Sequence, residues 1–260
     1  MELTYSAYLK LDQLLNSQQP LSPDEHDEML FIVIHQSYEL WFKQLLHEKE
    51  LLNQSLTGGC EFQAMATLRR MLSILKTVVN QVDILETMTP LSFAAFRSRL
   101  STASGFQSWQ FRLLEFYLGF RDASRLRSYP ESSEEFRSLH KALHEPSLFE
   151  NFLFFVSEHY NSDIPEDILN RDRTQPYQGD IRVVPLLLNL YKEHPTFRML
   201  CEMLTDFDEG FQEWRYRHVK MVERTIGYKN GTGGSEGVSY LRKSIFLQAF
   251  PDLWNIRSDF

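Results

Sequence analysis

The feature that most constrains this chain is a long run near its C-terminal end, residues 195–226, in which apolar side chains recur every three or four positions. The members are Leu200, Leu204, Phe207, Phe211, Trp214, Met221 and Thr225. That spacing places them on one face of an α-helix, and Gly227 is a typical residue at which such a helix stops. A helix of this length needs partner helices to bury the face, so the pattern favours a helical bundle.

An earlier stretch predicts a second long helix. Ser22 is a suitable N-cap, Pro23 suits the first helical position, and Glu25 would complete a capping box. The helix is expected to run to about Leu52. Residues 29–34 are apolar on every face, which is typical of a helix buried deep in the molecule.

The remaining pattern is also helical. A helix over residues 61–86 is expected to carry a stripe of Leu68, Leu72, Leu75, Val79 and Val82. Thr89 and Pro90 should start a helix that ends near Leu100, and Pro185 should start or kink another. We expect loops at residues 101–105 and 161–180, and further helices at residues 106–118, 146–159 and 238–249. No convincing alternation of period two indicates a strand. The prediction is an all-α bundle with long buried helices around a pocket, forming one domain over residues 1–260.

Composition narrows the class of partner. The chain of 260 residues has 43% hydrophobic residues, a formal net charge of −8 and a pI of about 5.5. Nucleic acid and anionic membranes call for a basic face, so neither is an expected partner. Two cysteines without paired spacing argue against a disulfide framework. No signal peptide or long apolar span is found, so we expect a cytoplasmic protein.

His218 lies on the apolar face of the long C-terminal run, between Trp214 and Met221. The flanking Arg215 and other basic residues are expected to point elsewhere. An imidazole in such surroundings is commonly a core histidine with a buried hydrogen-bond partner. The alternative is an axial haem ligand, which needs one neutral imidazole facing an apolar cavity.

A second imidazole, His35, shares a stripe with Phe31, Tyr38 and Phe42 on the early buried helix. Phe31 lies one turn before His35, so an aromatic ring and an imidazole face the same space. The pair suits a flat aromatic ligand with one polar edge. Ordinary filling of the core explains the same pattern.

Arg97 shares the apolar face of its helix with Phe93. A buried guanidinium needs a counter-charge, because an unpaired one costs several kcal/mol. A protein carboxylate is the common partner, but a ligand carboxylate would serve equally, since arginine binds carboxylates in a bidentate manner.

The segment from Gly231 to Gly237 is rich in glycine, but it follows a helix and so lacks the strand context of a dinucleotide-binding or P-loop motif. It is either a connector or a flexible lid that presents N–H groups or the Thr232 hydroxyl to an anion.

Taken together, the segments resemble the tryptophan 2,3-dioxygenase family of haem enzymes. The resemblance runs in order along nearly the whole chain and is least distinctive over residues 121–196. The matching stretches are Tyr5–Asp12, His26–Gln36, Glu39–Trp41, Ser104–Ser108, Phe111–Arg112, Trp214–His218, and Ile226–Gly227 through Gly231–Ser235.

The resemblance implies roles for individual residues. His218 would be the proximal ligand of haem b, with Ser104 and Gly105 near the haem edge. His35 would be the distal histidine and accept a hydrogen bond from the indole N–H of L-tryptophan. Arg97 would bind the substrate carboxylate. The other implied substrate contacts are Phe31, Phe93, Leu100, Thr232 and, from a neighbouring subunit, Tyr5 and Tyr8.

The implied reaction inserts both atoms of O2 across the indole C2–C3 bond and gives N-formyl-L-kynurenine, the first step of the kynurenine pathway. The resemblance also implies a homotetramer in which the N-terminal segment, about residues 1–20, contacts a neighbouring subunit. Three other functions remain open from the residues alone. They are a related haem enzyme that oxygenates another aromatic amino acid, a haem sensor without turnover, and a helical interaction module without a cofactor.

Overall fold

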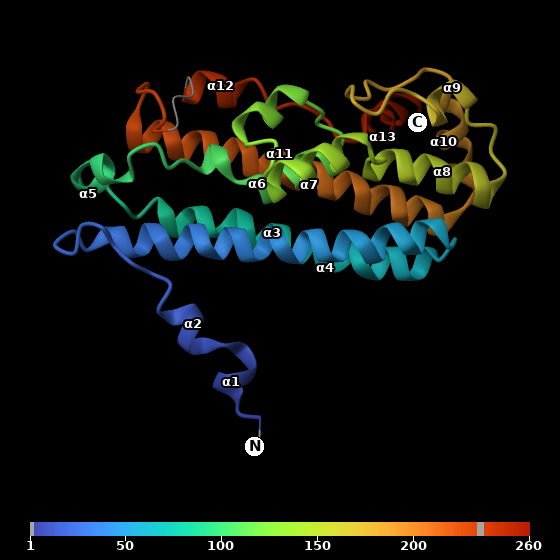
Figure 1. Cartoon of the computed structure of the whole chain (residues 1–260). Helices are drawn as coiled ribbons and strands as arrows, with labels where there is room; N and C mark the ends of the chain where they lie inside the picture. Colours follow the sequence, from blue (N-terminus) through green and yellow to red (C-terminus); the bar gives the residue numbers. More distant parts are fainter. Residues whose placement is uncertain (1–2, 233–236) are drawn as a thin grey trace.

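The computed structural model describes residues 3–232 and 237–260, and within these residues it contains helices and loops but no β-strand. The all-α class predicted from the periodicity is therefore confirmed. Figure 1 shows an elongated body from which the N-terminal segment stands apart. No described helix is long and apolar enough to cross a membrane.

Three long helices form the frame of the body: α3 (Asp27–Thr57), α4 (Glu61–Leu85) and α11 (Pro195–Ile226). Both α3 and α11 pack along α4 (Figure 1). Gly210 allows close approach of α11, because a Cβ atom at this position would lie 2.9 Å from Cδ2 of Leu75. The predicted bounds of α11 are confirmed, and the expected stripe on α4 is buried apart from Leu72, which is partly buried.

Shorter helices cover this frame and close its ends. In chain order they are α5 (Pro90–Arg97), α6 (Trp109–Tyr117), α7 (Glu134–His144), α8 (Leu148–Tyr160), α9 (Glu166–Leu169), α10 (Val183–Glu193), α12 (Val238–Arg242) and α13 (Pro251–Asn255). Short 3-10 turns occupy Ser98–Leu100, Gly105–Gln107, Ala123–Ser128 and Ile256–Asp259. The predicted start of α5 is confirmed, since Thr89 caps the helix by accepting a hydrogen bond from the Ser92 amide and Pro90 follows.

The start of α3 differs from the prediction. The helix begins at Asp27, and Ser22 does not cap it. The physical reason is a tertiary contact: the Glu28 carboxylate accepts hydrogen bonds from the amides of Leu21 at 2.9 Å and Ser22 at 2.6 Å. These bonds hold the preceding chain in a turn, in which the Glu25 amide donates to the Ser22 carbonyl.

The C-terminal region also differs from the single helix predicted over residues 238–249. The helix α12 ends at Arg242, and α13 begins at Pro251. Between them, backbone groups bond to side chains of α11, because Asp208 accepts from the amides of Ala249 and Phe250 while Arg215 donates to the Ser244 carbonyl. These contacts replace the hydrogen bonds that a helix would make.

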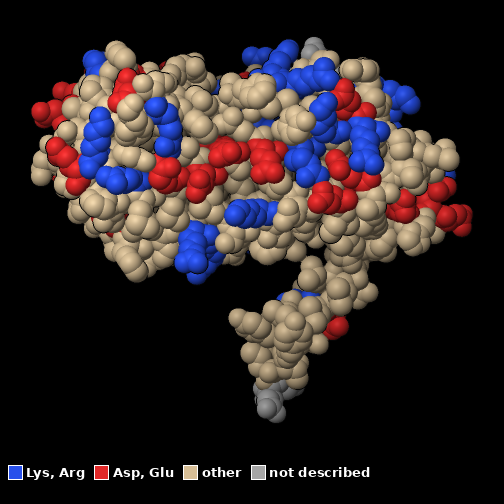
Figure 2. Space-filling model, turned by 180° about the vertical axis from the view of Figure 1, so that it is seen from behind, with Lys and Arg blue, Asp and Glu red and all other residues tan. Residues whose placement is uncertain are grey.

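The N-terminal segment forms two short helices, α1 (Tyr5–Leu9) and α2 (Leu11–Leu15), and neither contains a buried residue. Figures 1 and 2 show this arm extending away from the body. On the face of the body shown in Figure 2, basic and acidic side chains are interspersed and do not form a broad basic patch.

Candidate active site

A cavity of about 660 Å³ lies at one end of the body, between α3, α5, α6 and α11. Its size is in the range of cavities that enclose cofactors and drug-sized ligands. Part of its wall is the segment that follows α12 and the start of the glycine-rich loop. The predicted site residues that line it are Phe31, His35, Phe93, Arg97, Leu100, Ser104, Gly105, His218 and Thr232. Residues that are far apart in the sequence thus share one cavity.

Tyr5 and Tyr8, the other predicted contacts, do not line this cavity. They lie on the N-terminal arm, with 74% and 69% of their surfaces exposed. Within one chain the structure therefore separates them from the other site residues.

His218 enters the cavity from α11. Its ring stacks on Trp214 with 5.1 Å between the ring centroids and 4° between the planes. Burial lowers the pKa of His218 to about 4, and the positive charges of Arg112 and of His35 in its protonated form act in the same direction. The ring is therefore neutral at pH 7, and within residues 3–232 and 237–260 neither of its nitrogens has a hydrogen-bond partner. A neutral imidazole with a free nitrogen is suitable for a metal.

The other imidazole is oriented by the backbone of its own helix. Nδ1 of His35 lies 2.7 Å from the carbonyl oxygen of Phe31, which only accepts, so Nδ1 carries the proton. Burial lowers the pKa of His35, which keeps the ring neutral. Its Nε2 is consequently an acceptor. The Phe31 ring lies 4.1 Å from the imidazole and 5.8 Å from the ring of Phe93, centroid to centroid.

Arg97 and Thr232 both line the cavity near the start of the glycine-rich loop. The Arg97 guanidinium donates to the carbonyl of Asn230 at 2.6 Å, and the Thr232 hydroxyl donates to the carbonyl of Ala103 at 2.6 Å. No ion pair of Arg97 is present in the described part of the chain, and Arg97 is only half-buried. Within the described residues, Arg97 therefore has a neutral carbonyl as its partner and no protein carboxylate. Residues 233–236 of the predicted lid lie outside the described residues.

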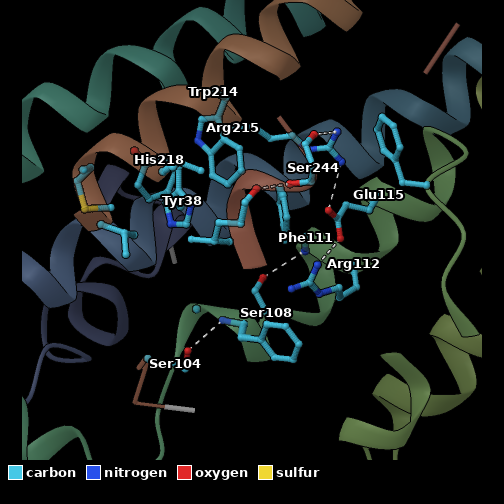
Figure 3. Close-up of a pocket in the computed structure, with 18 of the residues that line it drawn as sticks. Tyr38, Ser104, Ser108, Phe111, Arg112, Glu115, Trp214, Arg215, His218 and Ser244 are labelled. Carbon is cyan, nitrogen blue, oxygen red and sulfur yellow. Dashed lines mark hydrogen bonds and ion pairs between the residues drawn. The ribbon is translucent and has the colours of Figure 1, made fainter. Parts of the chain in front are cut away.

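The cavity also contains charged residues that sequence reasoning missed. Arg112 and Glu115, both on α6, form an ion pair, and the same carboxylate lies 3.4 Å from the Arg215 guanidinium (Figure 3). The prediction that Arg215 points away was wrong: it is 4% exposed and lines the cavity. The signal was its position one turn before His218, since residues three apart share a helix face.

Aromatic rings fill the wall between the two imidazoles. Tyr38 stacks on Phe42 at 6.1 Å, and Phe111 lies 5.4 Å from Phe42 and 4.8 Å from Trp214. Desolvation strongly raises the pKa of the Tyr38 hydroxyl, so it stays protonated at any physiological pH. This wall is aromatic, with neighbouring rings stacked or tilted against one another, and it offers apolar surface to a large planar ligand.

The side chains that could coordinate a metal indicate what kind of metal group the cavity would fit. Among the described residues, no three His, Cys, Asp or Glu side chains are grouped as they would be around a bare metal ion. One free imidazole supplies a single protein ligand, which fits a metal that brings its other ligands in a planar macrocycle. The guanidinium groups of Arg112 and Arg215 would suit the carboxylates of such a group.

The fold and the cavity define a class: an all-α protein with an internal site for planar aromatic groups, a metal-competent imidazole and a guanidinium for a carboxylate. Comparison with known proteins gives the family. The family model for tryptophan 2,3-dioxygenase matches residues 1–153 and 166–260, and the chain belongs to this family. The unmatched residues 154–165 fall within the region where the resemblance is least distinctive.

Several similar proteins bear the name tryptophan 2,3-dioxygenase. The one from Herpetosiphon aurantiacus is 52% identical over 258 residues, covering 99% of this chain and 98% of its own. The one from Anaeromyxobacter dehalogenans is 52% identical, covering 98% and 95%. A protein from Bacillus thuringiensis is 45% identical, covering 98% and 92%. Similarity therefore extends over nearly the full length of this chain and of these proteins.

Proposed function

We propose that this chain is a haem-dependent dioxygenase that converts L-tryptophan and O2 to N-formyl-L-kynurenine, the first step of the kynurenine pathway. The observation that carries the proposal is that His35, Arg97 and His218, which are distant in the sequence, line one cavity. Membership of the family supports it.

The residues fit haem b. His218 would be its axial ligand, because it is neutral and free of hydrogen bonds among the described residues. Ser104 and Gly105 would lie at the haem edge, and Arg112 and Arg215 would neutralise its carboxylates. Bound in its ferrous form, the haem supplies the activation of dioxygen, while the protein supplies orientation and polarity.

The indole ring of the substrate would pack against Phe31, Phe93 and Leu100. His35 then contributes an acceptor, since Nδ1 bonds to the Phe31 carbonyl and Nε2 faces the cavity as an unprotonated nitrogen. An indole N–H is a donor of matching polarity. The imidazole need only orient the ring, because oxygen addition at C2 and C3 does not require loss of the N–H proton.

Arg97 and Thr232 would bind the amino-acid end of the substrate. Arg97 is held by one hydrogen bond to Asn230, which leaves other N–H groups of its five for a carboxylate. Thr232, whose hydroxyl donates to Ala103, can still accept from the substrate ammonium. Such contacts fix the position of C2 and C3, which lowers the entropic cost of the reaction.

The arm supports a proposal about assembly. Tyr5 and Tyr8 are exposed and would complete the substrate site of a neighbouring subunit in a homotetramer. Exposed apolar side chains on the same arm, among them Leu3 and Leu15, suit such an interface. Both cysteines are free thiols, in keeping with the reducing cytoplasm as the proposed location.

Product analysis with L-tryptophan and O2 tests the proposal. We expect N-formyl-L-kynurenine that contains both atoms of labelled dioxygen. A hydroxylated amino acid would indicate the related enzyme instead, and bound haem without any product would indicate a sensor. Either result contradicts the proposal.

Arg97→Ala tests substrate binding in the same assay. A charge-assisted hydrogen bond contributes roughly 1.5–3 kcal/mol, so the Kd for L-tryptophan should rise at least about tenfold. Arg99→Ala, at an exposed position two residues on, is the matched control. An unchanged Kd in the Arg97 variant would exclude the proposed carboxylate contact.

A further inference from the structure

At the charged end of the cavity, one carboxylate separates two guanidinium groups. Glu115 accepts a hydrogen bond from Arg112 through Oε2 and another from Arg215 at 3.4 Å through Oε1. The three side chains are 15%, 9% and 4% exposed, in that order, and all of them line the cavity (Figure 3). Glu115 therefore forms an ionic link between α6 and α11 on this wall.

The two arginines are held differently. Arg215 also donates to the Ser244 carbonyl at 3.1 Å and lies over the Phe120 ring at 3.9 Å. Arg112 has Glu115 as its one polar partner among the described residues, and its guanidinium lies over the Phe106 ring at 4.8 Å. A guanidinium carries five N–H donors, so Arg112 keeps donors for a ligand in the cavity.

The charges of this cluster do not cancel. Counted by themselves, the two guanidinium groups and the Glu115 carboxylate carry a net charge of +1 in a largely buried position, where uncompensated charge is costly. A carboxylate of a bound ligand would supply compensating negative charge. Without Glu115, two adjacent positive charges would face the ligand.

We infer that Glu115 is a positioning residue that holds Arg112 and Arg215 at the carboxylate edge of the cofactor and, by its charge, sets the reduction potential of the bound iron. This inference rests on the proposed function. Positive charge near a haem favours the ferrous state, because ferrous haem carries one positive charge fewer than ferric haem. Removing the Glu115 charge therefore raises the potential, and removing the Arg112 charge lowers it.

The test is the reduction potential of the full-length, haem-loaded protein, measured by spectroelectrochemistry for the wild type, Glu115→Gln and Arg112→Gln. We expect shifts of opposite sign. For Glu115→Gln the preference for ferrous over ferric haem should rise roughly tenfold, or about 59 mV for a one-electron couple. Glu115→Asp, which keeps the charge, should stay close to the wild type.

Glu48→Gln is the matched control. Glu48 is also a buried carboxylate, paired with Arg70 at 3.1 Å, but it does not line the cavity. Its removal should leave the potential unchanged. Structural damage alone would not produce opposite shifts in the Glu115 and Arg112 variants, and if one of them fails to fold, the sign of the other still decides.

The outcomes separate this inference from the proposed function. If the wild type binds haem and neither variant changes the potential, or both shift it in the same direction, the role of Glu115 is refuted and the proposed function stands. If the wild type shows no Soret band after incubation with haem, both are refuted.

Discussion

The tautomer of His35 is fixed by its own helix. The Phe31 carbonyl, 2.7 Å from Nδ1, requires a proton on that nitrogen, and burial keeps Nε2 unprotonated by lowering the pKa. The imidazole is thus prepared to accept a hydrogen bond before any substrate arrives. As the pH falls through this lowered pKa, Nε2 is protonated and the acceptor is lost.

We predict that His35→Ala lowers turnover of L-tryptophan by roughly two- to tenfold without abolishing it, because a hydrogen bond to a neutral group contributes about 0.5–1.5 kcal/mol. The acid limb that His35 contributes to the pH profile should disappear in the variant. His140→Ala, at an exposed position on α7, is the control. Full turnover and substrate affinity in His35→Ala would contradict the distal role.

His218 links the site to stability in the cofactor-free protein. Its pKa is about 4 when folded and 6.5 in the reference state, so the unfolded chain takes up a proton first as the pH falls. The unfolded state binds more protons between these values, and the free energy of unfolding therefore falls with decreasing pH. Above pH 6.5 this contribution is constant.

The size of the effect follows from the shift. Each pKa unit corresponds to 1.36 kcal/mol, so about 2 kcal/mol should be lost between pH 7.5 and pH 5. Urea denaturation of the cofactor-free wild type and His218→Leu at both pH values measures it. The wild type should lose more stability than the variant, and parallel losses would show that His218 is not buried in its neutral form.

At the residue scale, sequence periodicity located the two imidazoles and Arg97 but not Glu115. A histidine among apolar residues at helical spacing is unusual and can be recognised in the sequence. The charged residues of α6 have the pattern of an ordinary solvent-exposed helix face. Only tertiary packing brings Glu115 of α6 to Arg215 of α11, and the spacing of residues along one helix does not show it. The partner of Arg97 within the chain was likewise unpredictable from helical spacing, because the Asn230 carbonyl is distant in the sequence.

At the element scale, helix α11 organises the C-terminal region through a buried carboxylate. Asp208 is fully buried, and its Oδ2 accepts from the amides of Ala249 at 2.9 Å and Phe250 at 3.2 Å and from Nε1 of Trp254 at 2.9 Å. These bonds anchor the segment that leads from the cavity wall into α13.

Asp208→Asn should therefore destabilise the fold by about 2–3 kcal/mol, because hydrogen bonds to a charged group are the strong ones and a neutral amide oxygen accepts the same three bonds more weakly. Urea denaturation measures the change. Asp206→Asn, exposed on the same helix, should be neutral within about 0.5 kcal/mol. Equal stabilities of the two variants would show that the anchor is unimportant.

Element boundaries were predictable where local signals had no competitor. Proline and glycine mark both ends of α11, and Thr89 and Pro90 mark the start of α5. Prediction failed where backbone amides donate hydrogen bonds to side chains more than one turn away in the sequence. Glu28 accepts from the Ser22 amide before α3, and Asp208 accepts from the Phe250 amide before α13. It also missed α7, which Ser133 caps at its N-terminus.

At the scale of the whole molecule, the chain consists of a body and an arm. The largest apolar core runs from the α3–α4 pair through α8 and α10 to α13, and a smaller cluster of Ile34, Leu85, Met88 and Phe96 closes the cavity end. We infer one domain, because Tyr38 packs against both clusters. The arm has no buried residue, which agrees with a role between subunits and leaves the cavity of a single chain without Tyr5 and Tyr8.

The most direct test is the absorption spectrum of the reduced, haem-reconstituted protein, recorded with and without L-tryptophan, for the wild type and His218→Ala. The account predicts a Soret band that changes on adding L-tryptophan in the wild type, and loss of the axially ligated spectrum in the variant. A wild-type spectrum that is indifferent to L-tryptophan, or a variant spectrum identical to it, would contradict the assignment of this cavity.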